Sequence, residues 1–325
     1  DLPNVEETEP SYMDFIIHDE TSVLKYWMKQ GISGWRLDVI DELPVPFLRD
    51  FYQTMKKENP DAVLIGEVWE DASNKISYEE QREYLCGHDI DSAMNYALRT
   101  IAVNFLLGQT DAGQMQRQLM HLIENYPAEH WYAMLNLISS HDIARILKVM
   151  TPKETADAAA IGKQRVKLLT AWQMTMPGAP CIYYGDEAGV TGGKDPDNRR
   201  TYPWGHEDTE LLQWTKDCTK LRHEHDALQT GRFIPVYAEG SVFAYVRSIE
   251  GGKDLFSKDS HDGRFLVAMN TSTVAEKTIT IQTDGLLYGT LTSLLDAAAP
   301  LQTVAGNVTV TLPPLTVQVW QCAPS

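Results

Sequence analysis

GWRLDV (residues 34–39) and, one helix later, AVLIGEV (residues 62–68) are two strand patterns from which the architecture of this chain can be predicted. Three more short runs of similar texture follow, SAMNY at 92–96, AMLNLIS at 133–139 and APCIYY at 179–184. Helical patterns lie around and between them, at 45–58, 98–107, 113–126, 155–176 and 208–227. Short apolar strands that alternate with helices predict βαβ units, and hence a parallel sheet.

The hydrophobic pattern of the sequence changes near residue 229, where polar and apolar residues begin to alternate. Such alternation predicts antiparallel, half-buried strands, at SVFAYVRSI (241–249), GRFLVAMN (263–270), KTITIQT (277–283), NVTVTL (307–312) and TVQVWQC (316–322). A length of 325 residues allows about two domains. We therefore predict an α/β domain at 1–228 and an all-β antiparallel sandwich at 229–325, with residues 1–18 irregular.

Composition argues against several kinds of partner. The net charge is −17, whereas nucleic acids and anionic membranes are bound through Lys and Arg. No apolar run approaches the ~20 residues that span a bilayer. The cysteines lack the spacing of a zinc site, so we expect free thiols and no metal or cofactor. No secretory leader is visible, which favours the cytoplasm, although the chain begins at Asp1 rather than Met.

Carboxylates lie near the ends of the first two runs, 34–39 and 62–68. Asp38 follows Arg36 by two residues, so both side chains point to one face of the strand, and a carboxylate held beside a cation suits a nucleophile. Glu67 precedes Trp69, and a carboxyl group beside an aromatic wall suits a general acid. A structural ion pair and a loop-binding Glu are the alternative interpretations.

His141 and Asp142 follow the fourth run. Taken alone, the His fits a core residue, and the Asp fits the N-cap of a helix that begins near Ile143. Taken with Asp38 and Glu67, they complete a set of acidic residues at the edge where α/β barrels place catalysis. Two carboxylates flanking a bond are typical of glycoside hydrolysis. A metal-dependent hydrolase is the rival hypothesis, but no HxH or HExxH spacing supports it.

A long loop, YGDEAGVTGGKDPDNRRTYPW, follows the fifth run. Asp195 and Arg199 are among its charged residues and offer hydrogen bonds that suit sugar hydroxyls. A salt-bridged loop is the alternative. Nearby aromatic residues, Trp69 among them, suit stacking on sugar rings.

These residues bring out a resemblance. GWRLDV, GEVW and SSHD resemble, in order, three signatures of the α-amylase family of glycoside hydrolases, and LPNVE at 2–6 resembles a further short signature. GAPCIYYGDEAGVTGGKDPDNRRTYPW is similar to the eighth-strand loop of the neopullulanase, cyclomaltodextrinase and maltogenic amylase branch. The resemblance implies a TIM (β/α)8 barrel followed by a β-sandwich, and a retaining hydrolase of α-1,4-glucans.

The resemblance also implies a role for each site residue. Asp38 would be the nucleophile, Glu67 the general acid and base, and Asp142 the group that stabilises the transition state. The substrate-binding residues would be Arg36, Trp69, His141, Asp195 and Arg199.

The strand count departs from the family pattern. Five strands are predicted where a complete barrel has eight, and the resemblance identifies them as strands four to eight. The open sheet edge is expected to need a partner, either a missing N-terminal half or a second copy. The competing hypothesis is that this chain alone is an inactive half-barrel that binds sugar weakly.

Overall fold

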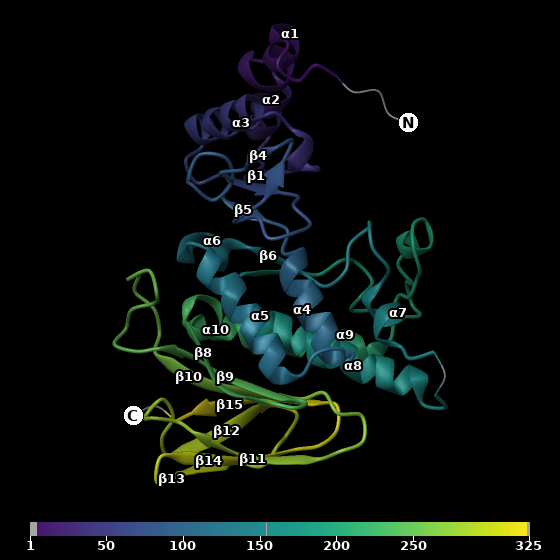
Figure 1. Cartoon of the computed structure of the whole chain (residues 1–325), viewed down its shortest axis with the longest axis vertical. Coiled ribbons are helices and arrows are strands. Elements are labelled where there is room, and N and C mark those ends of the chain that lie inside the picture. Colours follow the sequence, from purple (N-terminus) through teal and green to yellow (C-terminus); the bar gives the residue numbers. More distant parts are fainter. Residues whose placement is uncertain (1–4, 154, 324–325) are drawn as a thin grey trace. The chain divides into compact units, whose positions relative to one another are not determined.

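The computed structural model describes residues 5–153 and 155–323. The chain, coloured along its sequence in Figure 1, divides into two compact units. Unit 1 comprises Asp1–Ala97 and Leu122–Asn136, and unit 2 comprises Leu98–His121 and Leu137–Ser325. Residues 2–4 of the LPNVE signature lie outside the described residues.

A parallel sheet organises unit 1. Its strands are β1 (Gly34–Leu37), β2 (Val63–Gly66) and β5 (Ser92–Ala93), in the order β1-β2-β5. Gly34 is paired with Val63, whose carbonyl oxygen would lie 2.2 Å from a Cβ at position 34, so only glycine allows this approach. The predicted parallel pairing of the first two runs is present.

Helix α3 (Val45–Glu58) joins β1 to β2 with the predicted bounds. Pro46 lies in its first turn, where a proline costs no hydrogen bond. Phe47, Phe51 and Met55 recur every four residues and are buried, which explains why this segment packs as an amphipathic helix.

The prediction that residues 1–18 are irregular holds for residues 5–9 and is wrong for residues 10–18. Helix α1 (Pro10–Met13) continues into a π-helical turn, η1 (Asp14–His18), and α2 (Val23–Lys29) follows. Ser22 caps α2 by accepting a hydrogen bond from the backbone N–H of Lys25. Smaller elements of unit 1 are η2 (Ile40–Glu42), β3 (Ile76–Ser77), β4 (Glu80–Gln81) and α6 (Ala128–Ala133).

Unit 2 contains a helical part. Helix α8 (Ala158–Thr175) is buried along its second half, and α9 (Thr209–Glu224) packs against it, with the Trp214 indole N–H donating to the Lys167 carbonyl at 2.9 Å. The other elements of unit 2 before the β domain are α7 (Ile146–Met150), β7 (Ala179–Cys181), η3 (Asp197–Arg199) and α10 (Asp226–Thr230). Three elements have residues in both units, namely α4 (Tyr96–Leu106), α5 (Ala112–Asn125) and β6 (Leu135–Leu137).

The C-terminal part of unit 2 is an antiparallel β domain, as predicted. Within residues 232–322 its strands follow the order β11-β14-β13-β12-β15-β10-β9-β8. Their bounds are β8 (Arg232–Glu239), β9 (Val242–Ile249), β10 (Gly263–Asn270), β11 (Lys277–Gln282), β12 (Thr290–Leu295), β13 (Leu301–Val304), β14 (Asn307–Leu312) and β15 (Thr316–Cys322).

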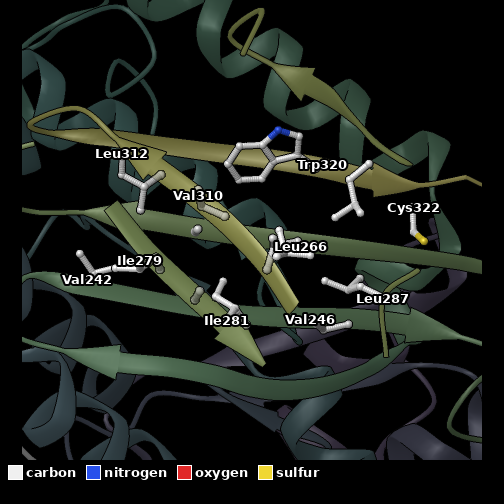
Figure 2. Packing of buried hydrophobic residues seen from close by; sticks show 14 residues of the cluster. Val242, Val246, Leu266, Ile279, Ile281, Leu287, Val310, Leu312, Trp320 and Cys322 are labelled. Carbon is white, nitrogen blue, oxygen red and sulfur yellow. The ribbon is translucent and has the colours of Figure 1, made fainter. Parts of the chain in front are cut away.

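The sheet folds back on itself around one core. Ile281 of β11, at one edge, shares a buried cluster with Val246 of β9, near the other edge, and with Trp320 of β15 (Figure 2). Two facing halves therefore enclose apolar side chains as in a sandwich, but β13 joins them into one continuous sheet.

Two buried arginines donate to backbone carbonyls around the end of α8, and one of them, Arg247, does so from the β domain. Arg222 of α9 donates to carbonyls at the end of α8, among them those of Met174 and Met176 at 2.9 Å. Arg247 of β9 donates to the carbonyls of Thr175 and Leu228. The bonds to the carbonyls of Met174, Thr175 and Met176 satisfy backbone groups that the end of α8 leaves without helical partners.

The structure adds two general findings. All four cysteines, Cys86, Cys181, Cys218 and Cys322, are free, as expected. None of the helices in the described residues has the length and apolar character that would let it cross a membrane.

Candidate active site

Strand register brings Asp38 and Glu67 to the same edge of the unit 1 sheet. Leu37 of β1 is paired with Gly66 of β2, so the next residue on each strand emerges at the carboxyl end of the sheet. The backbone N–H of Glu67 donates to the Leu37 carbonyl at 3.0 Å, which continues the pairing one residue further. Two parallel strands thus present two carboxylates side by side.

One guanidinium joins these carboxylates. Arg36 Nη1 pairs with Asp38 Oδ1, and Arg36 Nη2 lies 3.0 Å from Glu67 Oε2. The carboxylates differ in solvent contact, since the Asp38 side chain is 74% exposed and that of Glu67 only 3%. The Arg36 charge is therefore shared between an open carboxylate and an enclosed one.

Two further donors hold the Glu67 carboxyl group. The backbone N–H of Val39 donates to Oε2 at 2.9 Å, and the indole N–H of Trp69 donates to Oε1 at 3.0 Å. Val39 adopts a left-handed backbone conformation, with φ of 38°, which a β-branched residue rarely takes. The strain is located where the chain turns to direct an N–H at Glu67.

Trp69 donates to Glu67 through its indole N–H, and its ring remains partly exposed to solvent. Its ring stacks on Tyr96 with centroids 4.5 Å apart and planes 8° apart, and 44% of the residue is exposed. Sequence reasoning missed Val39 and Tyr96 as parts of this site. A strand-end valine and a helix-start tyrosine carry no sequence signal for such roles.

The other predicted residues form a second group, in unit 2. His141 Nε2 lies 3.2 Å from Asp142 Oδ2, and Arg199 Nε lies 2.7 Å from Asp195 Oδ1. Arg199 links the two pairs, because its Nε also donates to the His141 carbonyl at 3.2 Å and its Nη2 lies 3.9 Å from Asp142 Oδ1. The side chains are 28–56% exposed, so a ligand can reach them.

Asp142 does not cap a helix. Helix α7 begins at Ile146, four residues after Asp142, and its N-cap residue, Arg145, forms no side-chain cap hydrogen bond. The carboxylate of Asp142 lies near His141 and Arg199 instead. The alternative interpretation, that Asp142 is the N-cap of a helix beginning near Ile143, is therefore wrong.

Each group has a chemistry of its own. In unit 1, an exposed carboxylate and an enclosed, hydrogen-bonded one lie on the same cation, as a nucleophile and an acid–base group would. In unit 2, alternating carboxylates and cations can bind adjacent hydroxyl groups. Residues 5–153 and 155–323 contain no cluster of three or more His, Cys, Asp or Glu side chains suited to a metal ion.

Comparisons with known proteins assign most of this chain to one family. Residues 16–227 match the family described as "Alpha amylase, catalytic domain". An amylopullulanase of Thermoanaerobacterium saccharolyticum is 37% identical over 331 residues, covering 93% of this chain and 25% of that protein. A Bacillus cyclomaltodextrinase is 32% identical over 288 residues, covering 86% and 48%.

Solved structures give the same result. A cyclomaltodextrinase superposes with a TM-score of 0.80 at 29% identity, covering 97% of this chain and 49% of that one. A debranching enzyme from Nostoc punctiforme gives a TM-score of 0.77 at 27% identity, covering 97% and 62%. This chain thus spans a quarter to about three fifths of the length of these relatives.

Proposed function

Because this chain belongs to the α-amylase family of glycoside hydrolases, we propose that it carries the catalytic carboxylates of a retaining hydrolase of α-1,4-glucosidic bonds. Similar proteins bear the names amylopullulanase, neopullulanase, cyclomaltodextrinase and maltogenic α-amylase. The proposed substrates are accordingly maltodextrins, cyclomaltodextrins and pullulan.

The proposed reaction has two displacements. Asp38 attacks the anomeric carbon while Glu67 protonates the glycosidic oxygen, which gives a glycosyl ester and releases the first sugar. Glu67 then removes a proton from water, and the resulting attack on the ester frees Asp38. This mechanism requires the two carboxyl groups to be ~5–5.5 Å apart in the substrate-bound state.

The second group would bind the sugar under attack and its neighbour. Asp142 and His141 would contact hydroxyls of the ring that becomes positively charged, and negative charge there stabilises the transition state. Asp195 and Arg199 would hold the next sugar toward the non-reducing end. Trp69 would stack on a ring while its indole N–H keeps Glu67 in place.

A single observation supports this proposal most. Arg36 contacts the carboxylates of both Asp38 and Glu67, one exposed and the other buried. A purely structural ion pair would not need two carboxylates of such different exposure on one arginine. A nucleophile that must reach substrate and an acid that must be protected from water do need them.

The finer description of the fold is part of the proposal. We identify β1, β2, β5, β6 and β7 with strands four to eight of a (β/α)8 barrel, and we place the border with the β domain near residue 228. Strands one to three would come from an N-terminal half, or a second copy would cover the open edge. The alternative function is an inactive half-barrel that binds glucan weakly.

Mutation of the nucleophile tests the proposal. Asp38→Asn is compared with wild type and with Asp61→Asn, an exposed carboxylate outside both groups, by reducing-sugar release from maltodextrin in the protein that carries this chain. We expect turnover to fall at least ~10³-fold in Asp38→Asn only, as for other members of a catalytic set. Unchanged turnover would refute the assignment.

Two arms of this assay address the alternatives. Hydrolysis by residues 1–325 alone would exclude the inactive half-barrel, whereas activity that appears only with an N-terminal half would support it. Loss of activity in EDTA would favour a metal-dependent hydrolase instead of the carboxylate mechanism.

A further inference from the structure

We propose that Arg145 is a positioning residue that fixes the His141–Asp142 turn against the loop carrying Asp195 and Arg199. The inference rests on the proposed function, because it concerns how the sugar-binding group of unit 2 is held together. Arg145 acts through the backbone that presents these four side chains.

Arg145 is fully buried and reaches the long loop at several points. Its backbone N–H donates to the Gly192 carbonyl at 3.1 Å, and its Nε donates to the Asn198 carbonyl at 2.7 Å. Its Nη1 donates to the Tyr184 carbonyl. A single residue therefore connects the position before α7 with the start, middle and end of the loop.

The guanidinium is also enclosed by aromatic rings and a carboxylate. Its Cζ lies 3.9 Å from the centroid of the Tyr183 ring and 4.5 Å from that of Tyr184. Asp186 Oδ1 lies 3.4 Å from Nη1. A cation that contacts aromatic rings and also donates to carbonyl acceptors has little freedom to move.

Asn198 links the loop to the His141–Asp142 turn. It is fully buried, and its side-chain amide donates to the carbonyls of His141 at 2.7 Å and Ile143 at 2.8 Å. Asn198 precedes Arg199 directly, while His141 precedes Asp142. The chain of contacts thus runs from Arg145 to the Asn198 backbone, and from the Asn198 side chain to the turn.

Close packing makes this linkage stiff. A Cβ at Gly192 would lie 2.2 Å from the Asp197 carbonyl oxygen, so two parts of the loop touch through their backbones. The loop then cannot shift near residue 192 without also shifting residues 197–199. Because the Arg199 Nη2–Asp142 Oδ1 distance is 3.9 Å, movement of either segment changes the spacing of groups that would bind one sugar.

The burial of the Arg145 charge indicates that this residue fixes one backbone conformation of the loop rather than adding to the overall stability of the fold. Removing a guanidinium from water is costly, and apolar residues of similar size can serve stability as well or better. A fork of fixed donors does what an apolar side chain cannot, since it sets the positions of two separate carbonyls, those of Tyr184 and Asn198. Both carbonyls belong to the loop that carries Asp195 and Arg199.

Arg145→Met and Asn198→Ala test the inference in the protein that carries this chain. Arg222→Met is the matched control, because Arg222 is also buried and donates to several carbonyls, all of them outside the two segments of the site. Amide hydrogen exchange is followed in peptides that cover 139–146 and 192–200, and kcat and KM for maltodextrin are measured separately.

We expect faster exchange in both peptides for Arg145→Met and Asn198→Ala, and no change in exchange or kcat for Arg222→Met. We also expect kcat to fall about 100-fold for Arg145→Met, the scale of a displacement of ~1 Å in a catalytic group, with a smaller change in KM. Arg145→Lys, which keeps the charge but not the fork, should recover only part of kcat.

Unchanged exchange in the two peptides would refute the inference, as would faster exchange with unaltered kcat or an equal loss of kcat in Arg222→Met. The exchange measurement does not depend on turnover. If the wild-type protein hydrolysed no glucan, the proposed function would fail while the coupling of the two segments would still be tested.

Discussion

Replacement of Asp186 by asparagine should make this protein more stable relative to wild type as pH rises from 5.5 to 8.5, even though it removes a buried ion pair. The Asp186 carboxylate lies 3.4 Å from Arg145 Nη1 and is almost completely buried. Burial raises its pKa from 3.8 to about 7, in spite of the hydrogen bond from Ser139 and the Arg145 charge, which both act to lower it. The loss of hydration thus outweighs the attraction.

The raised pKa of Asp186 determines how the stability of the wild-type protein changes with pH. A carboxyl group whose pKa is raised on folding contributes stability below its unfolded value near 3.8, and that contribution is lost as pH rises through the folded value near 7. The whole difference corresponds to on the order of 4 kcal/mol, and about half of it develops between pH 5.5 and 8.5. The amide of Asp186→Asn would bear no such penalty, because it never ionises.

Urea unfolding followed by circular dichroism at pH 5.5, 7 and 8.5 measures the free energy of unfolding of wild type and of Asp186→Asn. The advantage of Asp186→Asn over wild type should grow by roughly 2 kcal/mol across the range. Asp208→Asn provides a control of opposite sign. Burial raises the Asp208 pKa, but hydrogen bonds from Lys163 and the start of α9 outweigh it and lower the pKa overall, so that variant should lose stability above pH ~4.

An Asp186→Asn protein that loses stability relative to wild type as pH rises from 5.5 to 8.5 would refute the reasoning. That result would mean that attraction to Arg145 exceeds the cost of burial, so that the ion pair itself holds the 183–199 loop. A constant difference between the two proteins across the pH range would also refute it, because no proton would then be linked to folding at this site.

Two further variants test unit 1. Trp69→Phe keeps an aromatic ring but removes the donor to Glu67 Oε1, and should lower kcat about 5-fold or more, from the loss of a hydrogen bond worth ~1 kcal/mol; an unchanged kcat would show that the bond is not used. Gly34→Ala places a Cβ 2.2 Å from the Val63 carbonyl oxygen and should destabilise unit 1 by ~2 kcal/mol or more. Gly113→Ala, with no neighbour nearer than 3.4 Å, should be neutral or stabilising, and equal melting temperatures for the two alanine variants would contradict the steric argument.

The parallel part of the fold was predictable because its signals are local. Apolar runs at 34–39 and 62–68 became β1 and β2, and the prolines near residue 45 marked the start of α3. Carboxylates directly after two such strands share one sheet edge whenever the strands are parallel and in register. Asp38 and Glu67 meet that condition, since Leu37 is paired with Gly66.

Other elements were missed because their partners decide them. Strand β8 contains Pro235, which weakens a strand pattern in sequence, yet it pairs along β9 with a shift in register after Pro235. Strands β12 and β13 are short and lie beside loops, and only pairing with β15 and β14 makes them strands. The helices between residues 10 and 29 are short, and sequence pattern is weakest for such segments.

The support of the candidate site lies beyond sequence reasoning for a different reason. A left-handed Val39 is disfavoured locally, and a buried, charged Arg145 is disfavoured by hydration, so propensity argues against both. Each is stable only because residues distant in sequence supply partners: Glu67 for the Val39 N–H, and the carbonyls of 184, 192 and 198 for Arg145. Positions where the chain departs from its local preferences are therefore the places to look for what holds catalytic groups in position.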